Sequence, residues 1–213
     1  MSMDNKEVTL LVLLDVSAAF NTIDHSTPLN ILQQDFGVVG TDLNWFDSFL
    51  SGRKQRILLG DKTSYDFNLN CGVLQGSCMG PILFTLYVSR LFNIISQHLP
   101  SVHGYVDDTQ IYLSFRPCSI HSEINAVSVI EKCIADVRSW FIGNRLTIND
   151  AKTDFLIIGT RQQLEKTSIE SIIIGDTAIK PLESVRNLGS WFDAHMRMNV
   201  HIGRICSKDF RGL

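Results

Sequence analysis

Residues 8–15 read VTLLVLLD, and the fold can be worked out from this stretch. The first seven residues, 8–14, are apolar apart from Thr9 and have no helical period, so they predict a strand buried on both faces. Asp15 follows the strand directly. A charged residue at the end of a buried strand is either a solvated strand end or part of a functional site.

Two more strands are predicted over residues 103–115, around a tight turn at Asp107 and Asp108. The other predicted strands are a hairpin across residues 55–69, a strand at 155–158 and a C-terminal hairpin at 172–179 that turns at Gly175 and Asp176. The predicted helices are residues 26–36, 41–52, 81–97 and 119–144. The last of these has an apolar stripe made of Ile124, Val127, Ile130, Ile134, Val137 and Phe141.

This order of elements predicts an α+β fold on the split β-α-β, ferredoxin-like plan, with an antiparallel sheet backed by helices and an extra C-terminal hairpin. In that plan the end of the first strand lies beside the turn of the central hairpin. Asp15 would therefore lie next to Asp107 and Asp108. Internal repeats and Pro- or Gly-rich linkers are absent from the sequence, so residues 1–213 are predicted to form one domain.

Composition sets limits on the function. The chain has 213 residues, 45% of them hydrophobic and 19% charged, which is an ordinary globular balance. Its net charge of −3 argues against a binder of nucleic acid, because contacts to phosphate need Lys and Arg. The C-terminal stretch 186–213 is locally basic, which fits either a surface facing nucleic acid or a solvated helix face.

The five cysteines are scattered and odd in number, which favours a reduced, intracellular protein of the nucleus or cytoplasm over a disulfide or zinc frame. The strongest apolar run, residues 8–14, is far shorter than the ~20 residues that a membrane-spanning helix needs. Residues 1–7 are polar and unlike a signal peptide. No membrane partner is therefore expected.

Three clustered carboxylates point to a metal site. Asp15, Asp107 and Asp108 would repel one another unless a multivalent cation lay between them. Hard oxygen ligands suit Mg²⁺, with Mn²⁺ as a substitute. Two ions about 3.5–4 Å apart can activate an attacking hydroxyl and stabilise the leaving oxygen of a phosphoryl group. The plain alternative is that an acidic pair such as Asp107-Asp108 is common in hairpin turns.

Five segments, in order, resemble the palm motifs of reverse transcriptases from non-LTR, LINE-type retrotransposons. They are LLDVSAAFNTIDH (13–25), CGVLQGSCMGP (71–81), YVDD (105–108), residues 146–159 centred on Lys152-Thr153, and VRNLG (185–189). The resemblance runs from Val8 to the C-terminus. It implies RNA-directed DNA synthesis, a nucleotidyl transfer from dNTPs to a DNA primer on an RNA template, while protein partners are not indicated.

The resemblance also implies roles for single residues. Asp15, Asp107 and Asp108 would hold the metals, and Lys152 would lie near the pyrophosphate as a general acid. The residues implied to contact the nucleotide or template are Val16 through its carbonyl, Phe20, Gln75, Gly76 and Tyr105. The ring of Phe20 would exclude a 2′-hydroxyl. Without the motifs, Phe20 is a core residue, Gly76 a turn glycine and Lys152 a surface lysine.

The chain departs from the family pattern at Asn21, Leu74, Cys78 and Val106, where Asp, Pro, Ile and Ala are usual. The family also carries fingers before the palm and a thumb after it, so residues 1–213 are expected to be a palm without either. The main alternative is an inactive retrotransposon-derived fragment that keeps the palm fold. A two-metal nuclease is a further alternative, but it would not need the Phe20 and Gln75-Gly76 motifs. Another is an RNA-binding module of unrelated fold, against which the sequence shows neither a basic groove nor paired exposed aromatics.

Overall fold

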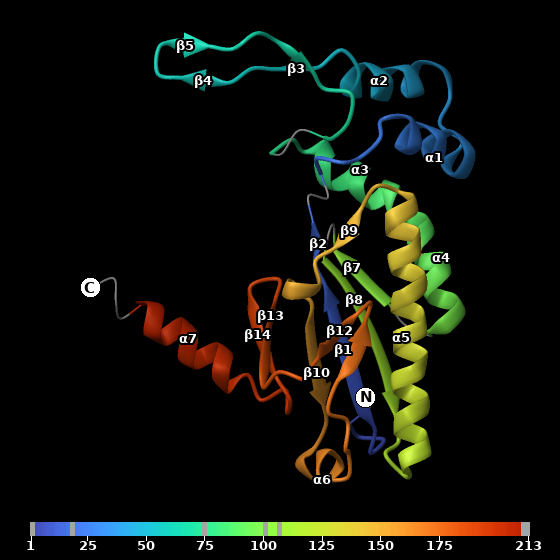
Figure 1. The fold of residues 1–213 in the computed structure, drawn as a ribbon, viewed down its shortest axis with the longest axis vertical. Coiled ribbons are helices and arrows are strands. Elements are labelled where there is room, and N and C mark those ends of the chain that lie inside the picture. The colour runs from blue at the N-terminus through green and yellow to red at the C-terminus, as the bar shows by residue number, and fades with distance from the viewer. Residues whose placement is uncertain (1–2, 18–19, 74–75, 100–101, 106–107, 210–213) are drawn as a thin grey trace.

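A computed structural model describes residues 3–17, 20–73, 76–99, 102–105 and 108–209. A four-stranded antiparallel sheet in the order β10-β1-β8-β7 lies at its centre (Figure 1). Its strands are β1 (Val8–Leu14), β7 (Val102–Tyr105), β8 (Asp108–Phe115) and β10 (Asp154–Ile158). The mixed helix-and-sheet architecture and the antiparallel sheet expected from the sequence are both present.

Strand β1 is central because it pairs along its length with β10 on one side and β8 on the other. Its burial alternates: Leu10, Val12 and Leu14 are buried, while the residues between them are partly exposed. One face of β1 therefore packs in the core. The prediction that both faces are fully buried was wrong, because the second face is only partly covered by the rest of the chain.

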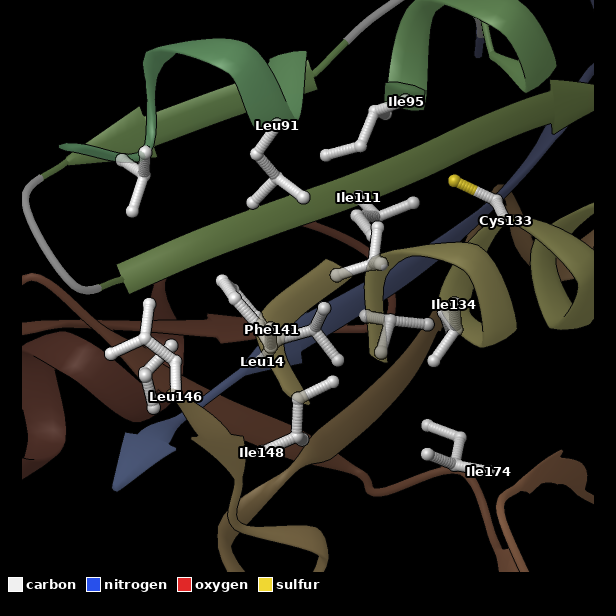
Figure 2. Packing of buried hydrophobic residues seen from close by; sticks show 14 of the residues in the cluster. Leu14, Leu91, Ile95, Ile111, Cys133, Ile134, Phe141, Leu146, Ile148 and Ile174 are labelled. Carbon is white, nitrogen blue, oxygen red and sulfur yellow. The ribbon is translucent and has the colours of Figure 1, made fainter. Parts of the chain in front are cut away.

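Helices α4 (Ser89–His98) and α5 (Ile120–Gly143) pack against each other along one side of the sheet (Figure 1). Ser119 begins α5 with a capping box, in which its side chain accepts from the backbone of Ser122. Figure 2 shows the core that results, with Leu91 and Ile95 of α4 and Ile134 and Phe141 of α5 directed into it. All four side chains are buried, which fixes these helices to the sheet.

The single helix predicted over residues 81–97 was wrong. The structure has α3 (Met79–Tyr87) and then α4, with Val88 between them and a bend of 43°. The two halves bury different surfaces, since α3 packs against α1 (Ser26–Phe36) whereas α4 packs against α5. One straight helix could not make both contacts.

The predicted stripe of α5 is correct only in its C-terminal part. Ile130, Val137 and the neighbouring members of that stripe are buried, but Ile124 has 59% of its surface exposed. At this end the helix buries Glu123 instead, which accepts hydrogen bonds from the backbone N–H (2.9 Å) and hydroxyl (3.0 Å) of Ser168. A tertiary contact therefore decides which face of the first turns is covered.

The remaining elements extend from this core. Towards the top of Figure 1 lie α1, α2 (Gly40–Leu50) and a long two-stranded arm. The arm consists of β3 (Lys54–Gln55), β4 (Leu58–Leu59), β5 (Lys62–Thr63) and β6 (Phe67–Asn68), which confirms the predicted hairpin. The other elements are β2 (Val16–Ser17), β9 (Thr147–Ile148), η1 (Asp150–Lys152), α6 (Arg161–Leu164), β11 (Ile172–Ile174), β12 (Thr177–Ile179), β13 (Ser184–Asn187), β14 (Ser190–Asp193) and α7 (Asn199–Asp209).

Strands β11 and β12 form the predicted C-terminal hairpin, with its turn at Gly175 and Asp176. A second hairpin, β13–β14, was not predicted. Its turn uses positive φ angles at Leu188 and Gly189, an arrangement that Gly favours and a leucine rarely adopts. Among the described residues, no single helix has the length and apolar character to cross a membrane, and α3 with α4 meets that test only as a bent pair.

Candidate active site

Asp15 and Asp108 are brought together by the pairing of β1 with β8. The last pair of that ladder is Leu14 with Thr109, so Asp15 and Asp108 are each the next residue beyond it. Leu14 and Thr109 are both buried. Because successive side chains of a strand point to opposite faces, the two carboxylates belong to the face away from this buried layer. The neighbourhood predicted for Asp15 and Asp108 is therefore present.

A cavity of about 120 Å³ lies at this end of the sheet. It is lined by Asp15, Asp108, Lys152 and Asp154, together with residues of β1, β8 and β13. The Nζ atom of Lys152 lies 4.0 Å from Oδ2 of Asp15, and 39% of the Asp15 side chain remains exposed. The site is thus open enough to admit a ligand, and it holds acidic and basic groups within reach of each other.

Asp154 was missed by the sequence analysis. It begins β10 and pairs with Leu13, two residues before Asp15, so it belongs to the same face of the sheet as Asp15. Burial, and then the charge of Asp15, raise the pKa of the Asp154 carboxyl. Asp154 directly follows Lys152-Thr153 in the sequence, but only the β1–β10 register shows that its side chain faces the same cavity.

Strand β13 closes the cavity from the other side. Its residues Arg186 and Asn187, followed by Leu188, line the wall, and Nε2 of Gln110 donates to Oδ1 of Asn187 at 3.1 Å. The family resemblance at residues 185–189 implies no role for any single residue of that motif. The structure adds one cation, Arg186, to the site.

Phe20 and Val16 follow Asp15 in the chain. The Phe20 ring packs on Phe84 of α3, with the ring centroids 5.4 Å apart. Val16 is buried and pairs with Ile148 of β9, while the backbone carbonyl of Asp15 accepts from the N–H of Asn149 at 2.8 Å. This pairing ties the end of β1 to the segment that carries Lys152.

The structure describes only some of the other predicted site residues. Tyr105 is the last residue of β7 and pairs with Asp108, and Gly76 has a φ of +83° with open space where a Cβ would lie. Asp107 and Gln75 lie outside the described residues, as do Leu74 and Val106 among the departures from the family pattern. Asn21 is exposed.

The donor chemistry fits a hard divalent cation. Carboxylates of Asp15, Asp108 and Asp154 supply the oxygens, and burial, followed by the charge of Asp15, raises the pKa of Asp154 among them. Within the described part of the chain, no three His, Cys, Asp or Glu residues are grouped as metal ligands. The predicted set of three includes Asp107, which is outside that part.

The chain is similar to known proteins in both sequence and fold. The sequence profile of the family "Reverse transcriptase (RNA-dependent DNA polymerase)" matches residues 1–192. The chain is also 23% identical over 207 residues to the "Probable RNA-directed DNA polymerase from transposon X-element" of Drosophila melanogaster. This match covers 93% of the chain but only 21% of that relative.

Among solved structures, the fold is similar to apo telomerase from Candida tropicalis, truncated from the C-terminal domain. The TM-score is 0.59 at 11% sequence identity, over 89% of this chain and 34% of the telomerase chain. The chain therefore spans about a fifth of the curated relative and a third of the telomerase structure. Because the family profile covers most of the sequence, the chain belongs to the reverse transcriptase (RNA-dependent DNA polymerase) family.

Proposed function

We propose that the chain carries the palm of an RNA-directed DNA polymerase, which adds dNTPs to the 3′-hydroxyl of a primer on an RNA template. The sheet order supports a ferredoxin-like palm. The first strand, β1, is flanked by β10 and by the β7–β8 hairpin, with α5 connecting β8 to β10. This is the order that the split β-α-β plan requires.

The observation that carries the proposal is the cavity that gathers Asp15, Asp108 and Lys152, three residues predicted as catalytic from separate motifs. Asp15 comes from β1, Asp108 from β8 and Lys152 from η1. A solvated strand end or an ordinary turn acid would not require these three groups to share a cavity. A polymerase requires it, because the nucleotide's phosphates must meet metal ligands and a proton donor together.

Asp15 and Asp108, with the predicted Asp107, would hold two Mg²⁺ ions, and Mn²⁺ could replace them. Bound there, the ions would neutralise phosphate charge and activate the attacking hydroxyl. The protein's own groups have distinct tasks. Lys152 would lie beside the pyrophosphate and donate a proton to it, and the Phe20 ring, supported by Phe84, would exclude the 2′-hydroxyl of an rNTP.

The distribution of charge supports a nucleic-acid substrate despite the net charge of −3. Arg186 and Arg204 line a cavity of about 340 Å³ between the β13–β14 hairpin and α7. The Arg204 guanidinium carbon lies 3.4 Å from the centre of the Trp191 ring. A cationic surface with an aromatic ring can contact both phosphates and bases.

Primer extension tests the proposal. We expect the chain to extend a DNA primer on an RNA template with Mg²⁺ or Mn²⁺, and Asp15→Asn to reduce extension by at least about 100-fold, since it removes a group acting on the transition state. Asp176→Asn is the matched control, because Asp176 is an exposed acid in a hairpin turn, away from the cavity.

Extension that survives Asp15→Asn would refute the assigned site. Metal binding should be measured separately, by the effect of Mn²⁺ on the melting temperature of wild type and Asp15→Asn. A chain that binds Mn²⁺ through Asp15 but extends no primer would refute polymerisation by this chain while leaving the metal site, as the inactive-fragment alternative predicts.

A further inference from the structure

Two loops that carry predicted nucleotide-binding residues are joined directly. One loop, residues 20–25, begins with Phe20, and the other, residues 71–73, lies just before Gln75 and Gly76 in the chain. The Val73 N–H donates to the Phe20 carbonyl at 2.7 Å, and the Gly72 N–H donates to the Ile23 carbonyl at 2.7 Å. An isolated antiparallel bridge also pairs Asp24 with Cys71. We call these two loops together the clasp.

His25 closes the clasp with its side chain. Its Nε2 atom lies 2.8 Å from the carbonyl oxygen of Gly72, across 47 positions of sequence. A carbonyl oxygen can only accept, so this nitrogen carries the proton and the ring donates. The imidazole is half-buried at the start of α1, where it has no part in capping the helix. The His25 side chain therefore bonds to the other loop and not to the first turn of α1.

At Gly72 the two loops of the clasp lie too close together to accommodate a side chain without displacement. Gly72 has a φ of +87°, and a Cβ there would lie 3.0 Å from the Asn21 carbonyl oxygen and 3.1 Å from that of Phe20. Both of these neighbours are backbone atoms. A side chain at Gly72 would thus press on the backbone of Asn21 and Phe20.

Phe20 is consequently held at two points. Its carbonyl is fixed by the clasp through Val73, and its ring rests on Phe84, which is itself buried in the core. A ring that excludes a 2′-hydroxyl must keep its position to within a fraction of an ångström, because a hydroxyl group is small. Fixing the backbone as well as the ring provides that precision.

We propose that His25 is a positioning residue which, through the Gly72 carbonyl, holds Phe20 in place and so sets the preference for dNTPs over rNTPs. The proposal rests on the proposed function, because it assigns a task in nucleotide selection. It concerns a residue that touches neither the nucleotide nor the metal ligands. Its effect should therefore appear in selectivity more than in the chemical step.

The kinetic experiment compares His25→Ala with His25→Gln in single-nucleotide incorporation on the whole chain. The ratio of kcat/KM for a dNTP to that for the matching rNTP should fall about tenfold in His25→Ala, the effect of losing one hydrogen bond. Gln carries an N–H donor at the reach of Nε2, so His25→Gln should recover the ratio to within about threefold. His98→Ala is the control, since His98 lies on α4 and bonds to Asp136, which is exposed on α5.

The second measurement needs no activity. Amide hydrogen exchange at Gly72 and Val73 should become about tenfold faster in His25→Ala than in wild type or His98→Ala, because the clasp opens more often. Unchanged exchange in a folded His25→Ala chain would overturn the role of His25 in holding the two loops together. An unchanged dNTP-to-rNTP ratio, or no rescue by a folded His25→Gln chain, would overturn the role in selection.

The two measurements also separate this proposal from the proposed function. A wild-type chain that incorporates no nucleotide at all would refute the proposed function, and the assignment to nucleotide selection with it. Exchange at Gly72 and Val73 would still decide whether His25 holds the two loops together.

Discussion

Replacing Gly72 by alanine should destabilise the chain more than the same change at a glycine of nearly equal φ. Gly72 has a φ of +87°, and Gly189, in the turn of the β13–β14 hairpin, has a φ of +86°. A Cβ at Gly189 would meet nothing within 4 Å, whereas one at Gly72 would meet two carbonyl oxygens at 3.0 and 3.1 Å. The pair therefore separates the cost of the close approach from the cost of the φ angle.

The magnitude follows from these distances. A left-handed φ costs an alanine about 1–2 kcal/mol, and this cost applies at both sites. The stabilisation from a less flexible unfolded chain also applies to both and cancels in the comparison. Only at Gly72 must the backbone give way, and the Phe20 carbonyl already accepts from Val73 at 2.7 Å. Overpacking of this kind costs about 1–3 kcal/mol more.

Thermal unfolding followed by circular dichroism gives the measurement. For a chain of this length, about 1 kcal/mol lowers the melting temperature by ~2–4 °C. Gly72→Ala should therefore melt about 2–12 °C below Gly189→Ala. Equal melting temperatures for the two variants would refute the close approach at Gly72, and with it the rigidity assigned to the clasp.

Three other outcomes are expected. Glu123 is 5% exposed and accepts two hydrogen bonds, which Glu123→Ala would remove. The free energy of unfolding measured by urea titration should therefore fall by about 2–3 kcal/mol. The control is Glu165→Ala, which should change it little because Glu165 is exposed. Burial, and then a neighbouring carboxylate, raise the pKa of Asp154 above 3.8 in the folded chain. The protonated carboxyl therefore contributes to the free energy of unfolding at acid pH, and this contribution is lost as pH rises through the folded pKa. Asp154→Asn should accordingly raise the melting temperature at pH 7 and leave it unchanged at pH 3. Burial raises the pKa of the Cys133 thiol to about 12, so a thiol reagent at pH 8 should modify the four exposed cysteines and spare Cys133 until the chain unfolds, as peptide mass mapping would show.

The sequence was most informative where local pattern decides the structure. The unbroken apolar run of residues 8–14 marked β1, and Gly175-Asp176 marked the turn between β11 and β12. Periodicity was less reliable where tertiary contacts compete with it. The break at Val88 and the exposure of Ile124 both arise because neighbouring elements select which helix face is covered.

Within the site, motifs located Asp15, Asp108 and Lys152, and the β1–β8 register confirmed that Asp15 and Asp108 are neighbours. Asp154 and Arg186 lie within two of these motifs, but the motifs alone did not indicate that both residues line the cavity. Those two residues reach it through the pairing of β10 with β1 and the contact of β13 with β10. Such contacts depend on strand register, which no local pattern encodes.

Side chains close together in the chain were enough to identify the family, the four strands of the central sheet and two of the carboxylates that line the cavity. Only the tertiary structure decided which other groups share the cavity and how the two loops of the clasp are joined. The physical reason is distance along the chain. His25 and Gly72 are 47 positions apart, and their loops meet through the packing of α1 against α3 and through backbone hydrogen bonds.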